Sequence, residues 1–127
     1  MSWHCHWESP VRLVVAVEPI GEVVGVAALV LVPSVIEPAG DSQWQCQLKE
    51  LYVRSSHRGH GVGEALLAWS AGYALDHGCG RMDWNVQEGN AGGIRFYTEL
   101  GATRVADRLR YRMGRAALEQ LATAQTA

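Results

Sequence analysis

The chain has no long apolar segment, no excess of one charge and no paired cysteine motif. Its two apolar runs, Val11–Val17 and Val23–Val32, fall far below the roughly 20 residues that a membrane-spanning helix needs. No basic segment precedes them as in a signal peptide. The formal net charge of −2 gives no basic field for nucleic acid. Cys5, Cys46 and Cys79 are odd in number, which favours a reducing compartment. We therefore expect a cytoplasmic protein that binds neither membrane nor nucleic acid.

Two common phosphate-binding patterns are also missing. In the dinucleotide pattern G-x-G-x-x-G, the third glycine after Gly59 and Gly61 would fall where this chain has Glu64. A Walker loop needs Gly-Lys-Ser/Thr at the start of a helix, and the sequence contains no such triplet. The tract His4-Cys5-His6 lacks the second pair of ligands that a structural zinc site needs, so we predict no metal.

What is present indicates one globular domain over residues 1–127, with 48% hydrophobic and 19% charged residues. Residues 1–10 have no clear periodicity and are expected to be irregular. Residues 115–127 are expected to form a short C-terminal helix or a fraying tail. The pattern predicts an α/β fold that begins with a hairpin at residues 12–18 and 23–32, followed by a loop at 33–43. Helices are expected at about 61–77 and 90–100. Further strands are expected at 44–53, 81–86, 103–106 and 109–113. The two strands around the first helix should run parallel.

The most informative stretch is Arg58-Gly59-His60-Gly61-Val62-Gly63, which lies between an apolar strand and an amphipathic helix. Its three glycines leave backbone N–H groups unobstructed, and the start of a helix adds unpaired donors with a partial positive charge. Arg58 supplies a cation beside them. The pattern therefore predicts a site for a phosphorylated ligand.

A second signal follows about 30 residues later, Asn90-Ala91-Gly92-Gly93-Ile94-Arg95-Phe96-Tyr97, closed by Leu100-Gly101-Ala102. With L-K-E-L-Y-V, R-G-H-G-V-G and G-C-G-R-M-D-W-N-V, the chain from about Gln47 to Met113 resembles the GNAT superfamily of acetyl-CoA-dependent N-acetyltransferases. It is most similar to the diamine (spermidine/spermine) and thialysine acetyltransferase branch. The resemblance implies a mixed, mostly antiparallel central sheet with splayed middle strands and flanking helices. Family members usually carry a further strand and one or two helices before the hairpin, so the N-terminal part is expected to be shortened.

The resemblance also implies the ligand contacts. Backbone N–H groups from Gly59 to Glu64 would bind the diphosphate of coenzyme A, and the pantetheine arm would pair like an added strand with the strand before the turn. Asn90 would contact the arm from the other side, and His60 either contacts phosphate or faces solvent. The expected cofactor-binding residues are Leu51, Tyr52, Val53, Arg58, Gly59, His60, Gly61, Val62, Gly63, Glu64, Asn90 and Gly93.

Amine acetylation needs a general base, because an alkyl ammonium with a pKa near 10.4 is almost wholly protonated at neutral pH. Glu50 is the expected base, although the glutamate usual in the branch falls one position earlier, at Lys49. Neighbouring side chains in a regular strand point to opposite faces, so Glu50 takes this role only through a bulge or a water relay. The alternatives are a structural carboxylate paired with Lys49 or an arginine, and Lys49 itself as a base with a pKa lowered by burial.

Tyr97 is the expected general acid. It follows Asn90 by two helical turns, so both side chains project from the same side of one helix. A phenol there can protonate the departing thiolate. The structural alternative is an aromatic core residue beside Phe96.

These residues predict an acetyl-CoA-dependent N-acetyltransferase that acts on a small, polyamine-like or lysine-like primary amine by direct attack in a ternary complex. One alternative is a non-catalytic acyl-CoA-binding sensor or assembly subunit, and another is a protein or peptide N-acetyltransferase. We expect a homodimer that shares the valine-rich hairpin.

Overall fold

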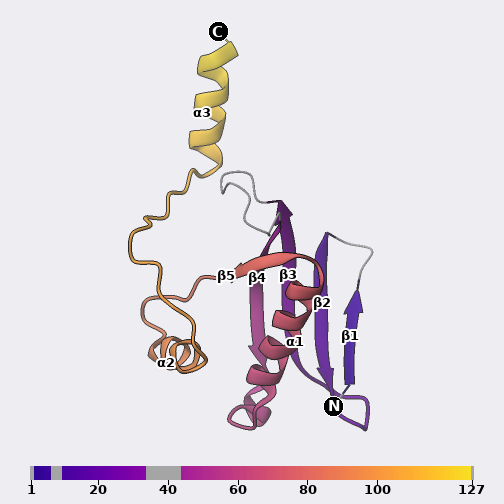
Figure 1. Cartoon of the computed structure of the whole chain (residues 1–127). Helices are drawn as coiled ribbons and strands as arrows, with labels where there is room; N and C mark the ends of the chain where they lie inside the picture. The colour runs from indigo at the N-terminus through magenta and orange to yellow at the C-terminus, as the bar shows by residue number, and fades with distance from the viewer. Residues whose placement is uncertain (1, 7–9, 34–43, 127) are drawn as a thin grey trace. The chain divides into compact units, whose positions relative to one another are not determined.

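The structure is a computed structural model that describes residues 2–6, 10–33 and 44–126 (Figure 1). The chain divides into two compact units, Met1–Arg95 and Phe96–Ala127. Helix α2 (Ala91–Glu99) crosses the boundary between them.

The first unit contains a five-stranded sheet in the order β1-β2-β3-β4-β5. Neighbouring strands are antiparallel except for the last pair, β4 and β5, which is parallel. The mixed, mostly antiparallel sheet is therefore confirmed, as is the parallel pair around the first helix. The strands are β1 (Ser2–His6), β2 (Val11–Val17), β3 (Val23–Pro33), β4 (Trp44–Val53) and β5 (Cys79–Asp83).

The predicted hairpin is β2 and β3, joined by a tight turn. The Glu18 N–H donates to the Glu22 carbonyl at 2.8 Å, and Gly21 adopts a φ of 91° that glycine accommodates readily. The N-terminal residues are a correction, because Ser2–His6 form β1 instead of irregular chain and pair with β2 from Ser2↔Val17 to His6↔Leu13. An edge strand is held by backbone hydrogen bonds on one side, which require no apolar alternation in its sequence.

Helix α1 (Val62–Asp76) packs on β2 to β5 and forms the core with them (Figure 1). Val62 and Leu66 are buried at its N-terminal end and Ala74 near its C-terminal end, which confirms the predicted helix. Gly78, with a φ of 79°, follows the helix as predicted, and β5 begins at the next residue, two positions earlier than expected.

Two cysteines lie in this core on adjacent strands. Cys46 is fully buried on β4, and Cys79 is buried at the start of β5. Burial, together with the neighbouring Cys79, raises the pKa of the Cys46 thiol from 9.0 to about 11, and burial also raises the pKa of Cys79. Both are therefore protonated structural thiols at neutral pH.

The second unit contains the end of α2 and helix α3 (Arg115–Thr126), which occupies the segment expected to be a tail or short helix. The closing strands predicted at residues 103–106 and 109–113 are wrong, because no strand occurs among the described residues 96–126. Leu109 and Tyr111 are 82% and 89% exposed. Alternating apolar residues favour a strand, but a strand also needs the backbone of a neighbour.

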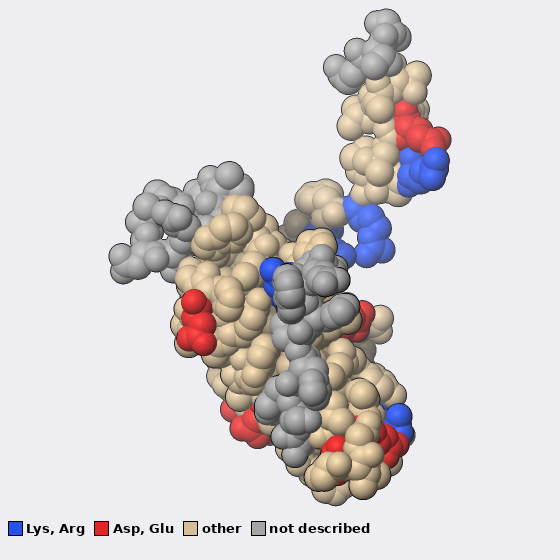
Figure 2. Space-filling model, turned by 90° about the vertical axis from the view of Figure 1, so that its right-hand side faces the viewer, with Lys and Arg blue, Asp and Glu red and all other residues tan. Residues whose placement is uncertain are grey.

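Charged side chains on the face in Figure 2 form small separate groups among uncharged residues, with no continuous basic surface over the described part of that face. Within residues 2–6, 10–33 and 44–126, no helix has the length and apolar content to span a bilayer.

Candidate functional site

The glycine turn lies where the sequence predicts it. After β4 ends at Val53, the short 3₁₀ helix η1 (Ser55–His57) leads into the turn, and α1 begins at Val62. Gly59 and Gly61 both have a φ of 80°, a conformation that side chains with a Cβ rarely adopt. A Cβ added at either glycine would meet nothing within 4 Å. These positions therefore need glycine for backbone conformation, and the space beyond them is open to a ligand.

The first turn of α1 presents unpaired donors at this opening. Its N-cap is Gly61, which has no side chain to accept their hydrogen bonds. The first bond of the helix runs from the Ala65 N–H to the Gly61 carbonyl at 3.0 Å. Within the described residues, the N–H groups of Val62, Gly63 and Glu64 have no acceptor. Such a helix start can bind an anion through its backbone.

The height of this helix start above the sheet is set by Gly25 on β3. A Cβ on Gly25 would lie 2.9 Å from Leu66 Cδ1, 3.1 Å from Val62 Cγ1 and 3.2 Å from the Tyr52 carbonyl oxygen. Only glycine allows α1 to pack this closely at the end of β4. Close packing at Gly25 thus fixes the unpaired N–H groups beside the last residues of β4.

The end of β4 has a free edge on its β5 side. The pairing of β4 with β5 runs from Trp44↔Cys79 to Gln47↔Asp83 and then stops, whereas β4 continues to Val53. This confirms the predicted splay of the middle strands. Leu51, Tyr52 and Val53 lie in the unpaired part, which an extended ligand could join as a further strand.

Arg58 lies back against this strand end. Its Nε donates to the Val53 carbonyl at 3.0 Å, and its guanidinium carbon is 5.7 Å from the centroid of the Tyr52 ring. His60 is exposed in the turn. A cation is therefore held between the free edge of β4 and the glycine turn.

Lys49 is the extra residue of a β-bulge in β4. Ala28 on β3 pairs with Glu50, but the next residue, Leu29, pairs with Leu48. Before the bulge, Cys46 and Leu48 face the core under α1, and after it Leu51 and Val53 do so. Glu50 is therefore exposed on the opposite face of the sheet, together with Tyr52. A bulge is one of the two conditions, with a water relay as the other, under which the sequence predicts a catalytic role for Glu50, and that role stays a prediction.

Asn90 caps α2, as predicted. Its Oδ1 accepts the Gly93 N–H at 3.0 Å, and its carbonyl accepts the Ile94 N–H at 3.0 Å. A Cβ on Gly93 would lie 2.6 Å from Asn90 Nδ2, so a larger residue there would require the Asn90 side chain to shift. The structure gives both residues a local role, and their contact with a ligand stays a prediction.

Tyr97 lies on α2 in the second unit, half-buried and with its ring 5.2 Å from that of Phe96. Burial raises the pKa of the Tyr97 phenol above its ordinary value of 10.0. The phenol is therefore protonated throughout the neutral range and can act as a proton donor.

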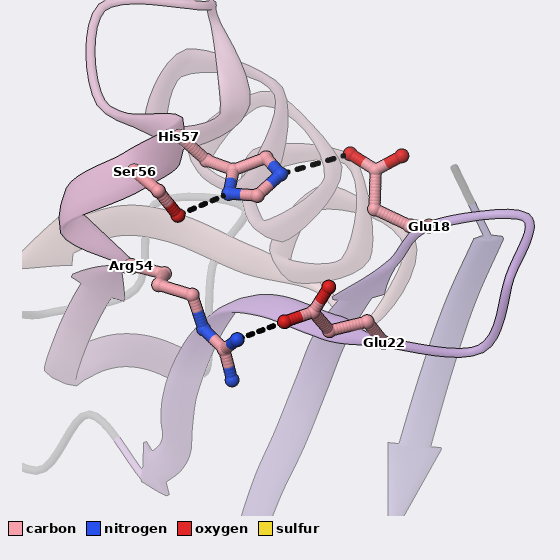
Figure 3. A network of polar contacts seen from close by, with 5 residues as sticks. All are labelled: Glu18, Glu22, Arg54, Ser56 and His57. Carbon is pink, nitrogen blue, oxygen red and sulfur yellow. Dashed lines mark hydrogen bonds and ion pairs between the residues drawn. The ribbon is translucent and has the colours of Figure 1, made fainter.

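A polar network before the glycine turn was missed by the sequence analysis (Figure 3). It joins the β2–β3 turn to η1 through an ion pair between Arg54 and Glu22 and a contact of 3.3 Å between His57 Nε2 and Glu18 Oε1. No local pattern points to it, because Glu22 and Arg54 are 32 positions apart.

The sequence and the fold are similar to those of known proteins. Residues 2–102 match the family model described as the acetyltransferase (GNAT) family. An integron cassette protein from the mobile metagenome of V. cholerae has a similar solved structure, with a TM-score of 0.78 and 31% identity over 91% of this chain and 68% of that one.

Two curated proteins are similar over a shorter stretch. L-ornithine N5-acetyltransferase NATA1 of Arabidopsis thaliana is 34% identical over 55 residues, which are 43% of this chain and 24% of that protein. Thialysine N-epsilon-acetyltransferase of Bos taurus is also 34% identical over 55 residues, or 43% of this chain and 32% of that enzyme. The match thus spans a third or less of either curated relative, and both fit the branch expected from the sequence motifs.

Proposed function

Because the chain belongs to the acetyltransferase (GNAT) family, we propose that it transfers the acetyl group of acetyl-CoA to a primary amine. One observation carries this proposal. The open glycine turn, the unpaired N–H groups of α1 and the free edge of β4 lie together in one compact unit. They provide donors for a diphosphate next to an edge for an extended amide-bearing arm.

In this proposal the chain holds the thioester mainly through its backbone. The N–H groups from Gly59 to Glu64 bind the diphosphate, and the free edge from Leu51 to Val53 pairs with the pantetheine arm. Arg58 exchanges its bond with the Val53 carbonyl for the negative charge of the ligand. The Asn90 side-chain amide, whose oxygen caps α2, contributes its nitrogen to the arm.

Glu50 is the proposed general base. The bulge at Lys49 exposes Glu50 on the face of the sheet opposite α1, next along the strand to the free edge. There it takes a proton from the acceptor ammonium, directly or through water, and leaves a lone pair on nitrogen. The amine nitrogen then bonds to the acetyl carbon as the carbon–sulfur bond breaks.

Tyr97 is the proposed general acid. Its protonated phenol donates to the sulfur as the thiolate departs, which prevents the thiolate from attacking the new amide. The phenolate then recovers a proton from solvent. The protons balance as follows: the ammonium nitrogen loses one proton to Glu50 before the attack and a second to water after the carbon–nitrogen bond has formed. One proton reaches the sulfur, and the overall reaction releases one proton to solvent.

The proposed acceptor is a small molecule with a side-chain amine. Both curated relatives are named for acetylation of such an amine, on ornithine or on thialysine. A lysine-like amine shares this chemistry. We also propose a homodimer in the cytoplasm, with the hairpin β2–β3 as the shared surface, since Leu13 and Val23 are 39% and 46% exposed.

Calorimetry with acetyl-CoA and coenzyme A tests the binding step, and release of the free thiol tests turnover with ornithine, lysine, spermidine and a lysine peptide. We expect binding of both nucleotides and turnover with a side-chain amine. No heat of binding at millimolar acetyl-CoA would refute the proposal. Binding without turnover on any acceptor would favour the non-catalytic sensor, and turnover on the peptide alone would favour a protein acetyltransferase.

Two isosteric variants test the chemistry. Tyr97→Phe and Glu50→Gln should each lower kcat by about 10²-fold or more, as expected for loss of general acid–base catalysis. The dissociation constant for acetyl-CoA should not change, since neither side chain belongs to the backbone site. Unchanged turnover in either variant would remove that residue from the mechanism.

A further inference from the structure

Two acidic residues of the β2–β3 turn hold the segment that leads into the glycine turn (Figure 3). Glu22 pairs with Arg54, and Glu18 contacts His57 at 3.3 Å. Ser56 Oγ lies 2.8 Å from His57 Nδ1, on the other side of the ring. Arg54, which precedes η1, and Ser56 and His57 of η1 come just before Arg58 in the sequence.

The hairpin turn is itself well defined. The Glu18 N–H donates to the Glu22 carbonyl and the Gly21 N–H to the Glu18 carbonyl, both at 2.8 Å. The Arg54 N–H donates to the Val24 carbonyl at 2.8 Å, so Arg54 is attached to the hairpin through both its backbone and its side chain. The His57 N–H in turn donates to the Arg54 carbonyl at 2.8 Å.

The glycine turn is therefore anchored on both sides. Val62, only 3% exposed, fixes the side that enters α1, and Arg54 and His57 fix the side that leaves β4. Between these anchors lie Gly59 and Gly61, both with a φ of 80°, and glycine has the widest range of allowed backbone conformations of any residue. Each anchor reduces the freedom that a ligand must remove when it binds.

We propose that Glu18 and Glu22 are positioning residues for the nucleotide site: they hold His57 and Arg54 so that the backbone N–H groups of the glycine turn are preorganised for a diphosphate. This inference rests on the proposed binding of acetyl-CoA. The opposing effect is electrostatic, because the two carboxylates place negative charge near an anion site. If the two carboxylates act by positioning, their removal should weaken the binding of the nucleotide. If their negative charge dominates, their removal should strengthen it.

A double-mutant cycle of Glu22→Ala and Arg54→Ala tests the proposal by calorimetry with coenzyme A. Arg54 and Glu22 are 48% and 42% exposed, so we expect each single variant to weaken binding by about two- to fivefold. The double variant should lose no more than either single variant, because both act through one pair. Glu119→Ala is the matched control, since it breaks the exposed pair with Arg115 on α3 and should leave affinity unchanged.

Hydrogen exchange of the amides from Gly59 to Glu64 in the ligand-free protein gives a second measurement. Exchange should be faster in Glu22→Ala than in the wild type and unchanged in Glu119→Ala. If the wild type binds coenzyme A but Glu22→Ala binds equally or more tightly, the positioning role is refuted and the proposed function stands. If the wild type binds no coenzyme A, the proposed function fails, and this inference fails with it.

Discussion

Replacing Gly25 by alanine would test whether close packing sets the position of the nucleotide site. The new Cβ would lie 2.9 Å from Leu66 Cδ1 and 3.2 Å from the Tyr52 carbonyl oxygen. Leu66 is fully buried and the carbonyl belongs to the backbone of β4, so neither can move aside alone. The strain must therefore be relieved by moving the first turn of α1 away from the sheet.

The size of the effect follows from these distances. Carbon atoms in contact prefer about 3.5–4.0 Å, so α1 must rise by roughly 0.5–1 Å at Leu66. Overpacking of this kind costs about 1–3 kcal/mol of unfolding free energy. The same displacement moves the N–H groups of Val62, Gly63 and Glu64 from their place beside β4. Weakening one hydrogen bond to a charged diphosphate costs about 1.5 kcal/mol or more, so we expect an affinity for acetyl-CoA that is about tenfold weaker.

Urea unfolding and calorimetry measure the two effects, and Gly72→Ala is the matched control. Gly72 is exposed on the same helix, and a Cβ there would meet nothing within 4 Å. Alanine at Gly72 should therefore raise the unfolding free energy by about 0.5–1 kcal/mol and leave affinity unchanged. A Gly25→Ala protein as stable as the wild type and equal in affinity would refute the reasoning.

Three further predictions concern the turn, the second helix and the core. Gly61→Ala should lower stability by about 1–2 kcal/mol in urea and weaken coenzyme A binding, because its φ of 80° disfavours a Cβ; equal stability would contradict this. Asn90→Asp should preserve the cap of α2, whereas Asn90→Ala should lose about 1 kcal/mol; if both bind coenzyme A as the wild type does, the Asn90 amide does not contact the arm. Stability should fall as pH rises from 9 to about 11, by up to about 3 kcal/mol, since the unfolded Cys46 thiol ionises while the folded one keeps its proton. Cys46→Ala should flatten this pH dependence, and an unaltered slope would exclude the thiol as its source.

Most of the first unit could be predicted from local patterns. Valine-rich runs indicated β2 and β3, and apolar residues at helical spacing indicated α1. The glycine turn was also predictable, because the conformations at Gly59 and Gly61 depend on the backbone of those residues alone. These features arise from neighbouring residues, which the sequence displays directly.

The bulge in β4 leaves a signal in the sequence. Cys46 and Leu48 are two positions apart, as are Leu51 and Val53, but Leu48 and Leu51 are three apart. When the spacing of apolar residues changes from two to three within an otherwise alternating strand, an inserted residue is indicated. The network of Glu22 and Arg54 left no such signal, because only the fold brings the two residues together.

The bulge also bears on how β4 tolerates changes in length. Because Lys49 is the inserted residue, a chain that lacked it would run Leu48-Glu50-Leu51-Tyr52-Val53, with apolar and polar positions in strict alternation. Omitting Lys49 would thus keep every other side chain on its present side, whereas omitting Glu50 would bring lysine to the outward position. Single-codon deletion at these two neighbouring sites should therefore yield proteins that both fold but differ in the sign of the charge on the outer face of β4.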